Sequence, residues 1–566
     1  VDIITLSLPL VIMHNELYNA YWLMKKKLLL RNIDNQSVWQ IILFLVFTLI
    51  ILSKNIYSFV CMIDSTQINL SYMSVIRILS TYTVFALIIS IISFIYYRQI
   101  VSWIILIVTD CWILANLLYY RSYHDLLSIW SIDSINQLQL YDGIIFPYCR
   151  LSDLFLILTT LLWVCITYIP RFRKKIITRN LTIFALTSVV VFFIPWTLMA
   201  HRSKNIINPF NPYYHDVSMG RVWYAQTFSV TAHGFNELFS LPKRWSDITD
   251  DSVTVDLQDR FGVHTSVKSD CDVVIVLFES LESWVVDTTI YGNEITENIN
   301  LLIREPNTLF VKNVFPQVKM GRSADAQLIT FTGLLPVNQG ITCMRYMNNT
   351  YPSLAEASSA YFRKIYVPTS PSAWNQDAMT YAFGFKELYA EEVSDRVICN
   401  KLLDDVKAQD SSFFVMMTTM ASHVPFEMYS DSSDIAMPMD YQHAKYLKSV
   451  NYTDACLKPL IDYCLKEKER PTLLIITGDH TTLDTPISTS VPFVMYYSEG
   501  VDVGDDMKEI LQMDLYPTIL NVMGCDEYYW KGLGRNLLDS STVRVNNAEE
   551  LSNQLIKSNF FYTSGE

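Results

Sequence analysis

The sequence contains ten cysteines but no C-x-x-C pair. Zinc knuckles and dithiol redox centres use that spacing, so neither is predicted. Cys456 and Cys464 are eight residues apart in a helix-like stretch. That separation is about 12 Å along a helix axis, too far for a disulfide between them. The sequence leaves the pairing of the other cysteines open.

An excess of basic residues is also missing. The formal net charge is −13, and residues 1–200 contain 14 Lys+Arg against 9 Asp+Glu, a net +5. The rest of the chain therefore carries −18. That balance argues against a nucleic-acid partner and against electrostatic docking on anionic lipid. Internal repeats and low-complexity tracts are absent as well.

Long apolar runs, by contrast, are abundant. Hydrophobic residues make up 51% of the chain and the mean hydropathy is +0.21, which is unusual for a soluble protein. The short apolar run before Lys25 has no small-residue cleavage site, so we do not expect a signal peptide. Five later stretches approach the ~20 apolar residues of a membrane-crossing helix: about 38–53, 78–97, 100–119, 151–169 and 181–200. We therefore predict a transmembrane domain of five α-helices over residues 1–200.

Basic residues flank these stretches in a pattern that predicts their orientation. The clusters at 25–31 and 171–179, together with Arg98, fall on one side if there are five crossings. The positive-inside rule then places the N-terminus in the cytoplasm and everything after about residue 200 outside a cytoplasmic membrane. Asp110 lies midway along the third stretch. It is either a functional intramembrane carboxyl or a carboxyl paired between helices.

The remaining chain divides into two parts. Residues 201–269 are polar and aromatic, and we expect a membrane-proximal linker in which segments such as 222–241 form amphipathic helices at the membrane surface. Over residues 270–566, short apolar runs alternate with helical stretches: 273–278, 364–368, 413–419, 473–477 and 493–497. This pattern predicts an α/β domain with a mainly parallel sheet covered on both faces.

Polar side chains follow three of these runs, where the active sites of parallel sheets gather. They are Glu279, Thr418, Asp479 and His480. Gly478 permits a tight turn that would bring Asp479 and His480 toward one point. A carboxylate and an imidazole are common ligands of a divalent metal, and Glu279 with Ser323 would complete a set of four. As a lone residue, Glu279 would more often be a helix-start carboxylate.

Ser323 lies in K-M-G-R-S-A-D-A, at the start of an apolar, helix-like segment. A hydroxyl there meets free backbone N–H groups and a helix dipole that favour a phosphoryl oxygen. The alternative is an ordinary N-cap serine. A bound metal would make the hydroxyl a nucleophile near neutral pH. Oxygen-dominated sites suit Mn²⁺ or Mg²⁺, with Zn²⁺ as a rival.

Other candidates lie in nearby motifs. His423, in M-A-S-H-V-P-F, could bind a substrate phosphate or protonate a leaving alkoxide, or it could be an exposed loop histidine. Trp374 and Asn375, in S-A-W-N-Q-D, could form a wall of a substrate pocket, although most tryptophans simply belong to the core. Glu282, three residues after Glu279, is expected on a helix surface.

Taken together, these motifs resemble the lipoteichoic acid synthase branch of the alkaline phosphatase and sulfatase superfamily. The matching phrases are F-E-S, G-R-S-A-D, W-N-Q-D, S-H-V-P-F, Y-L-K-S-V-N-Y-T-D, T-G-D-H and D-L-Y-P-T. The family has five membrane helices followed by an outer catalytic domain. The resemblance implies a metal held by Glu279, Ser323, Asp479 and His480, with Ser323 as nucleophile and a substrate pocket that includes Trp374 and His423.

The chain departs from the family pattern at three places. Ser323 stands where the family usually has threonine, and Gln376 stands where it usually has arginine. A family histidine some residues before the tryptophan is also missing, and the run V-P-T-S-P-S replaces it. The expected function is a metal-dependent phosphotransferase at the outer face of a membrane. It would move a phospholipid head group, phosphoglycerol by resemblance, through Ser323 to a lipid or glycan acceptor.

Alternatives to this function remain. The head group could be phosphoethanolamine, or water could be the acceptor, as in a phosphodiesterase or phosphatase. A non-catalytic lipid-binding protein is disfavoured because all four proposed ligands are present. A sulfatase is disfavoured because no C-x-P-S-R motif surrounds Ser323. We expect one divalent metal, with Mn²⁺ favoured over Mg²⁺ or Zn²⁺.

Overall fold

The computed structural model describes two compact units. The first is formed by Val1–Arg121 and Tyr148–Leu241, and the second by Ser122–Pro147 and Pro242–Glu566. The structure describes residues 35–62, 72–95, 99–123, 126–128, 148–168, 183–184, 187–188, 220–244, 257, 259–264 and 271–563. Within the last range, residues 359, 361, 430–431, 439–440, 467–468, 483–486 and 502–508 are not described.

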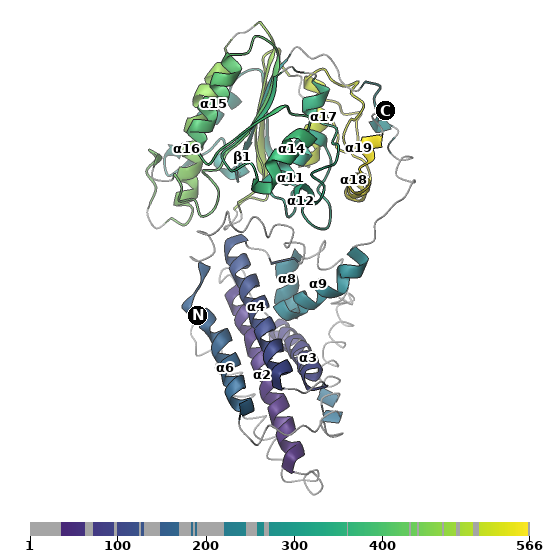
Figure 1. The fold of residues 1–566 in the computed structure, drawn as a ribbon. Helices are drawn as coiled ribbons and strands as arrows, with labels where there is room; N and C mark the ends of the chain where they lie inside the picture. Colours follow the sequence, from purple (N-terminus) through teal and green to yellow (C-terminus); the bar gives the residue numbers. More distant parts are fainter. Residues whose placement is uncertain are drawn as a thin grey trace. The chain divides into compact units, whose positions relative to one another are not determined.

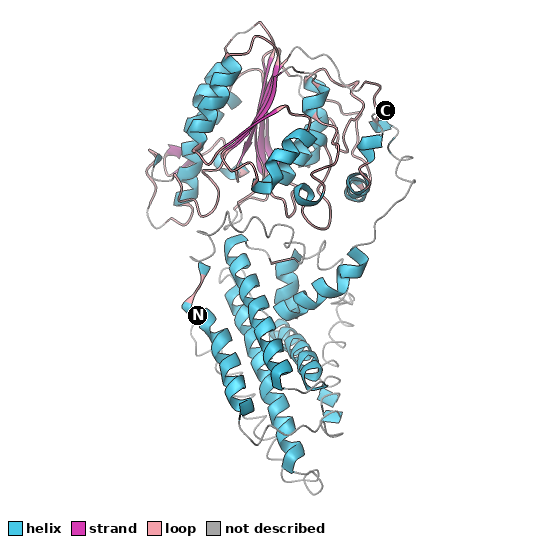
Figure 2. Ribbon diagram, viewed as in Figure 1, coloured by secondary structure: helices cyan, strands magenta, loops and turns pink. Residues whose placement is uncertain are grey.

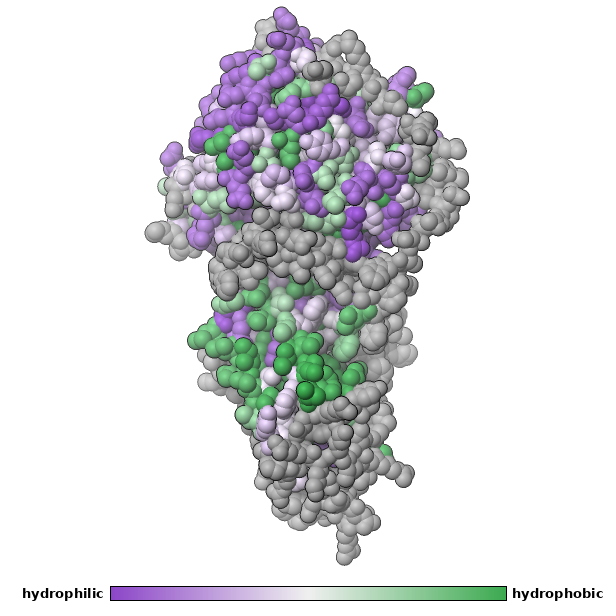
Figure 3. All heavy atoms as spheres, viewed as in Figure 1, coloured by the Kyte–Doolittle hydropathy of each residue, from purple (hydrophilic) through white to green (hydrophobic). Residues whose placement is uncertain are grey.

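The first unit is helical (Figure 1), and among its residues that are coloured in Figure 3 the hydrophobic ones prevail. Its long helices are α2 (Asn35–Met62), α3 (Tyr72–Ile95), α4 (Gln99–Tyr123) and α6 (Leu154–Tyr168), the last preceded by the 3-10 turn η3 (Leu151–Asp153). Among the described residues, three helices are long and apolar enough to cross a membrane: Trp39–Met62, Ile100–Arg121 and Leu151–Tyr168. A shorter apolar helix spans Ile78–Phe94. The fifth predicted stretch, 181–200, lies almost wholly outside the described residues.

A buried ion pair ties three of these helices together. The fully buried Nζ of Lys54 on α2 donates hydrogen bonds to the carboxylate of Asp110 on α4, to Leu156 O (2.7 Å) and to Thr160 Oγ1 (2.9 Å) on α6. Thr160 Oγ1 in turn donates to Asp110 Oδ2 at 2.5 Å. Of the two readings of Asp110, the structure shows the helix-paired carboxyl.

Removing one member of this pair should be far more damaging than removing both. Lys54→Met leaves the Asp110 charge without its partner and should cost about 3–5 kcal/mol of stability. The double variant Lys54→Met, Asp110→Leu removes both charges and should recover most of that loss. Thermal unfolding of the purified protein in detergent measures both effects. Equal losses in the single and double variants would contradict the pairing.

Two shorter helices, α8 (Gly220–Phe228) and α9 (Val230–Arg244), occupy the region where amphipathic helices were expected. They pack against the long helices. Tyr82 on α3 donates to Ala225 O at 2.9 Å, and Trp112 on α4 donates to Val230 O at 2.9 Å. Thr231 Oγ1 donates to Asn55 Oδ1 on α2 at 3.0 Å. These contacts make α8 and α9 part of the first unit.

The second unit is built on an eight-stranded sheet (Figure 2). Its strand order is β10 (Ile510–Leu511), β4 (Thr308–Phe315), β9 (Val491–Tyr497), β8 (Thr472–Gly478), β1 (Asp272–Phe278), β7 (Phe413–Thr418), β5 (Phe362–Val367) and β6 (Glu387–Ala390). Neighbouring strands pair in parallel except on both sides of β9, which runs antiparallel to β4 and β8. All five predicted runs are strands, and the mainly parallel sheet is confirmed with one reversed strand.

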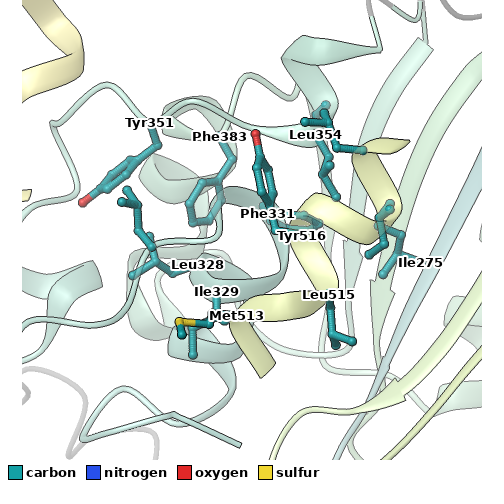
Figure 4. Packing of buried hydrophobic residues seen from close by; sticks show 14 of the residues in the cluster. Ile275, Leu328, Ile329, Phe331, Tyr351, Leu354, Phe383, Met513, Leu515 and Tyr516 are labelled. Carbon is teal, nitrogen blue, oxygen red and sulfur yellow. The ribbon is translucent and has the colours of Figure 1, made fainter. Parts of the chain in front are cut away.

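Both faces of the sheet are covered, because successive residues of the central strand enter opposite cores. Val273, Ile275 and Leu277 of β1 belong to one apolar cluster, and Val274, Val276 and Phe278 belong to the other. Helices α11 (Ser323–Thr332), α14 (Gln376–Ala382) and α17 (Leu515–Val522) lie on the first side, and α15 (Asp395–Lys407) and α16 (Ala444–Cys464) lie on the second (Figure 1). Figure 4 shows Phe331 of α11 and Tyr516 of α17 packed in the first cluster.

The smaller elements of this unit lie around the sheet. They are η7 (Ser283–Val285), β2 (Thr289–Ile290), β3 (Asn293–Glu294), α10 (Glu297–Ile303), α12 (Thr342–Arg345), α13 (Leu354–Ala357), η8 (Ala373–Asn375), η10 (Gln512–Asp514), α18 (Ala548–Lys557) and α19 (Phe560–Thr563). All ten cysteines lie in the described residues and none forms a disulfide, including Cys456 and Cys464.

Candidate active site

The site forms where β1, β7 and β8 end side by side. Leu277 of β1 is in register with Thr418 of β7 and with Thr477 of β8, so the residues that follow these strands emerge at one edge. Thr419, the residue after β7, accepts a hydrogen bond on Oγ1 from Glu279 N at 2.9 Å. Parallel register therefore brings together side chains that are about 140 to 200 residues apart.

The turn after β8 fixes Asp479 by backbone contacts. A Cβ on Gly478 would lie 2.3 Å from Leu281 O, so the chain passes here only because residue 478 has no side chain. Asp479 Oδ1 accepts hydrogen bonds from Ser280 N at 2.8 Å and from His480 N at 2.7 Å. Its second oxygen, Oδ2, lies 3.6 Å from His480 Nε2.

Glu279, Asp479 and His480 form a compact buried cluster. One ligand atom of each lies within 4.8 Å of the others, which is the spacing of a set that could hold a metal ion. His480 Nε2 lies 3.9 Å from Glu279 Oε1. Two carboxylates and one imidazole are hard and borderline donors that suit divalent ions such as Mn²⁺, Mg²⁺ or Zn²⁺.

The electrostatics of the cluster favour a cation. Burial, followed by the negative charge of Glu279, raises the pKa of Asp479 to about 7. Burial also opposes the ionisation of Glu279, but the imidazoles of His480 and His423, together with hydrogen bonds from Ser280 and Ser323, leave the Glu279 pKa below its usual value. Two carboxylates this close in a buried site disfavour each other's charge. A divalent cation between them would remove that conflict, so the residues present fit a metal.

Ser323 lies against this cluster. Its Oγ donates a hydrogen bond to Glu279 Oε2 at 3.1 Å and lies 3.3 Å from His480 Nε2. Ser323 is the first residue of α11, and the N-cap position belongs to Arg322, whose φ is +48°. The alternative of an N-cap serine is therefore wrong: the hydroxyl points to the carboxylate and imidazole instead of capping the helix.

The loop before Ser323 is held by a residue that the sequence analysis did not single out. Asp325 Oδ2 accepts hydrogen bonds from Lys319 N and Gly321 N, both at 2.9 Å. A Cβ on Gly321 would lie 2.3 Å from Asp325 Oδ1. Burial raises the pKa of Asp325 to about 6 despite these N–H donors. The sequence signal for this role was an aspartate in the first turn of the predicted helix, because short acidic side chains bind nearby backbone N–H groups.

The other sequence candidates come from three further segments: the loop after β7, the 3-10 turn η8 and the end of β7 itself. His423 donates from Nδ1 to Val424 O at 2.7 Å, and its imidazole is one of the groups that lower the pKa of Glu279. Trp374 and Asn375 are both in the left-handed region, with φ of +53° and +51°. Asn375 Nδ2 donates to Cys343 O at 3.1 Å. Thr418, the last residue of β7, ends its strand beside the site, as expected.

Gln376 faces the helix that carries Ser323. Its amide exchanges two hydrogen bonds with Gln327 of α11, at 2.9 and 3.1 Å, and the side chain is buried. The residue at the family's arginine position thus contributes no charge here, and its polar atoms bind within the fold.

The expectation for Glu282 is wrong. The side chain is fully buried, and Glu282 has an extended backbone just before the 3-10 turn η7, so it does not lie on the surface of a helix. Its carboxylate accepts hydrogen bonds from Trp284 Nε1 at 2.7 Å and from three backbone N–H groups at 3.0 to 3.1 Å. Burial is the main cause of the raised pKa of this carboxyl.

Comparison with known proteins gives matches to both parts of the chain. Residues 272–525 match the sulfatase family model, and residues 24–225 match the model for the lipoteichoic acid synthase N-terminal domain. Lipoteichoic acid synthase 2 of Bacillus subtilis (strain 168) is 22% identical over 484 residues, which is 76% of this chain and 73% of that protein. Lipoteichoic acid synthase 1 of the same organism is 22% identical over 490 residues, 77% of this chain and 75% of that protein.

Among solved structures, lipooligosaccharide phosphoethanolamine transferase A from Neisseria meningitidis has the same fold. It superposes with a TM-score of 0.53 and 11% identity over 87% of this chain and 97% of that one. The chain thus has an α/β sulfatase-like domain preceded by apolar helices, three of which, among the residues that the structure describes, are long and apolar enough to cross a membrane. The matches to both parts make the chain a lipoteichoic acid synthase-like phosphotransferase.

Proposed function

We propose that this protein transfers a phospholipid head group, with phosphoglycerol favoured, by way of Ser323 to an outer lipid or glycan acceptor. The observation that carries the proposal is the place of the Ser323 hydroxyl. It lies at the start of α11, 3.1 Å from Glu279 Oε2 and 3.3 Å from His480 Nε2. The synthase relatives, which match about three quarters of the chain, support this reaction class.

Glu279, Asp479 and His480 would hold one divalent cation, with Ser323 Oγ as the fourth ligand and Mn²⁺ favoured over Mg²⁺ or Zn²⁺. When bound, the cation neutralises the buried carboxylates and favours ionisation of the serine hydroxyl. The protein's own groups do the rest. Glu279 Oε2 accepts the hydrogen bond from Ser323 and so orients Oγ toward an incoming phosphorus.

The reaction has two displacements at phosphorus. Ser323 Oγ attacks the phosphodiester, an Oγ–P bond forms, and the bond from phosphorus to the diglyceride oxygen breaks. The diglyceride leaves with a proton. A hydroxyl of the acceptor then attacks phosphorus, the Oγ–P bond breaks, and the serine hydroxyl is restored.

His423 is the proposed proton donor to the leaving oxygen. Because its Nδ1–H is engaged by Val424 O, the ring presents Nε2, which in the imidazolium form would hydrogen-bond the phosphate or protonate the diglyceride oxygen. Trp374 and Asn375 are proposed to line the head-group pocket. With Gln376 held by Gln327, that pocket receives no cationic side chain from position 376.

The proposed setting is a cytoplasmic membrane that the chain crosses five times, with residues 1–200 as the transmembrane domain, 201–269 as a membrane-proximal linker and 270–566 as an extracytoplasmic catalytic domain. Three candidate spans and one shorter apolar helix support the membrane part of this proposal. The donor would be a membrane phospholipid and the acceptor a lipid or glycan on the same outer face. No nucleic-acid partner is proposed.

Product analysis tests the function. The full-length protein, reconstituted with Mn²⁺ in vesicles of phosphatidylglycerol, should release diglyceride and elongate an added glycolipid with phosphoglycerol. Phosphatidylethanolamine vesicles are the matched control, and faster turnover there would favour phosphoethanolamine as the head group. Release of free glycerol phosphate at the same rate with and without glycolipid would show that water is the acceptor and contradict the proposed transfer.

A further inference from the structure

The segment that follows the cluster is held at both ends by one buried carboxylate. Glu282 Oε1 accepts a hydrogen bond from Thr482 N at 3.1 Å, and Oε2 accepts from Ile487 N at 3.1 Å and Ser488 N at 3.0 Å. Trp284 Nε1 donates to Oε2 as well, at 2.7 Å. Glu282 N itself donates to Tyr446 Oη at 3.1 Å, so the backbone that presents the carboxylate is also fixed.

One of these bonds leads directly to His480. The imidazole donates from Nδ1 to Thr481 O at 2.9 Å. Thr481 C=O and Thr482 N–H belong to the same planar peptide group, so they cannot turn independently. Glu282 Oε1 binds the N–H of that group, and His480 Nδ1 binds its C=O.

This peptide group determines which imidazole nitrogen is free. A carbonyl oxygen only accepts hydrogen bonds, so Nδ1 must carry the proton and Nε2 keeps its lone pair. Nε2 is the nitrogen that faces Ser323 Oγ at 3.3 Å and Asp479 Oδ2 at 3.6 Å. Histidine ligands generally need such a partner on the second nitrogen to fix ring orientation and tautomer.

We propose that Glu282 is a positioning residue for His480: its carboxylate holds the Thr481–Thr482 peptide group, and that group holds the imidazole with Nε2 toward the ligand cluster. This inference rests on the metal centre proposed above. Glu282 touches neither Ser323 nor a reacting atom, and its effect passes through backbone only.

We call the path from Glu282 through the Thr481–Thr482 peptide group to His480 the relay. Glu282→Gln tests the relay with little change in side-chain volume. Glutamine has one acceptor oxygen, and if that oxygen stays with the three donors on Oε2, the amide NH₂ faces Thr482 N–H, which it cannot bind. The peptide group then loses its anchor. We expect the affinity of the purified full-length protein for Mn²⁺, measured by calorimetry, to fall about 10- to 100-fold. Turnover should recover at saturating Mn²⁺, because the ligands themselves are intact.

Asp454→Asn is the matched control. Asp454 is also a buried carboxylate that accepts backbone N–H bonds, from Asn298 at 2.9 Å and Ile299 at 3.0 Å, but it caps α10 and contacts no cluster residue. The Asp454→Asn variant should lower the thermal unfolding temperature of the metal-free protein about as much as Glu282→Gln does. Its Mn²⁺ affinity should stay within about twofold of the wild-type value, because Asp454 lies outside the relay.

The outcomes separate the relay from the metal centre itself. Unchanged Mn²⁺ affinity in Glu282→Gln, or an equal loss in Asp454→Asn, overturns the relay while the metal centre stands. A wild-type protein that binds neither Mn²⁺ nor Zn²⁺ overturns both. If Glu282→Gln does not fold, Glu282→Asp is measured against the same thresholds, since its shorter carboxylate cannot reach both ends of the segment.

Discussion

Ser323→Ala is expected to lower head-group transfer by at least ~10³-fold, because it removes the attacking oxygen. The fold should survive. The change deletes one half-buried hydroxyl and its hydrogen bonds to the Glu279 carboxylate and the His480 ring, which is worth about 1 kcal/mol. Most Mn²⁺ affinity should also remain, since two carboxylates and one imidazole are untouched. Mass spectrometry of the wild-type protein after incubation with phosphatidylglycerol should find a phosphoglycerol adduct on the Ser323 peptide that the variant lacks.

Ser280→Ala is the sharpest control for this experiment. Ser280 Oγ donates to the other oxygen of the same carboxylate, Glu279 Oε1, at 2.8 Å, but it is not on α11. This variant should keep the adduct on Ser323. Ser323→Thr should keep part of the activity, since the resemblance to lipoteichoic acid synthases implies a threonine hydroxyl at this position. An adduct on Ser280, Thr481 or Thr482 in the wild-type protein would show that the nucleophile has been misassigned.

Asp479→Asn should reduce Mn²⁺ affinity by more than about 100-fold, beyond the usual effect of a residue that only supports a ligand. Turnover should fall with it. Asparagine keeps the Oδ1 acceptor that Ser280 N and His480 N use, so the loss reports the missing charge and not a broken turn. Glu279→Gln should behave in the same way. Metal content of the purified protein and its turnover measure the two losses together.

In the metal-free protein, Asp479→Asn should not lower thermal stability. This result would show that the loss of Mn²⁺ affinity and turnover is not caused by unfolding. The folded pKa of Asp479 is about 7, above its unfolded value of ~4, so the ionised carboxyl destabilises the metal-free fold increasingly from about pH 4 to pH 7. Asp479→Asn should therefore unfold at an equal or higher temperature than the metal-free wild type at pH 7. A variant that keeps full metal content and full turnover would refute the ligand assignment.

One wrong prediction and two missed strands have the same cause. Glu282 looked like a helix-surface residue because the spacing from Glu279 to Glu282 is helical, but the chain turns at Ser280, where φ is +53°, and buries the side chain. β4 was missed because its polar Lys312 and Asn313 interrupt the apolar run, and β10 was missed because it has only two residues. In each case a distant segment decided the outcome. The N–H donors of Thr482, Ile487 and Ser488 did so for Glu282, pairing with β9 did so for β4, and pairing with β4 did so for β10.

The sequence by itself determined the features that depend on local pattern: the apolar helices, five of the eight strands of the sheet and the polar residues that follow them. Apolar runs must be buried, so the ends of parallel strands could be located without coordinates, and Glu279, Asp479 and His480 with them. Only the tertiary structure decided that Ser323 lies 3.1 Å from Glu279 and that one peptide group links Glu282 to His480. Contacts between residues 44 or 200 positions apart depend on strand order and loop closure, and no local periodicity encodes them.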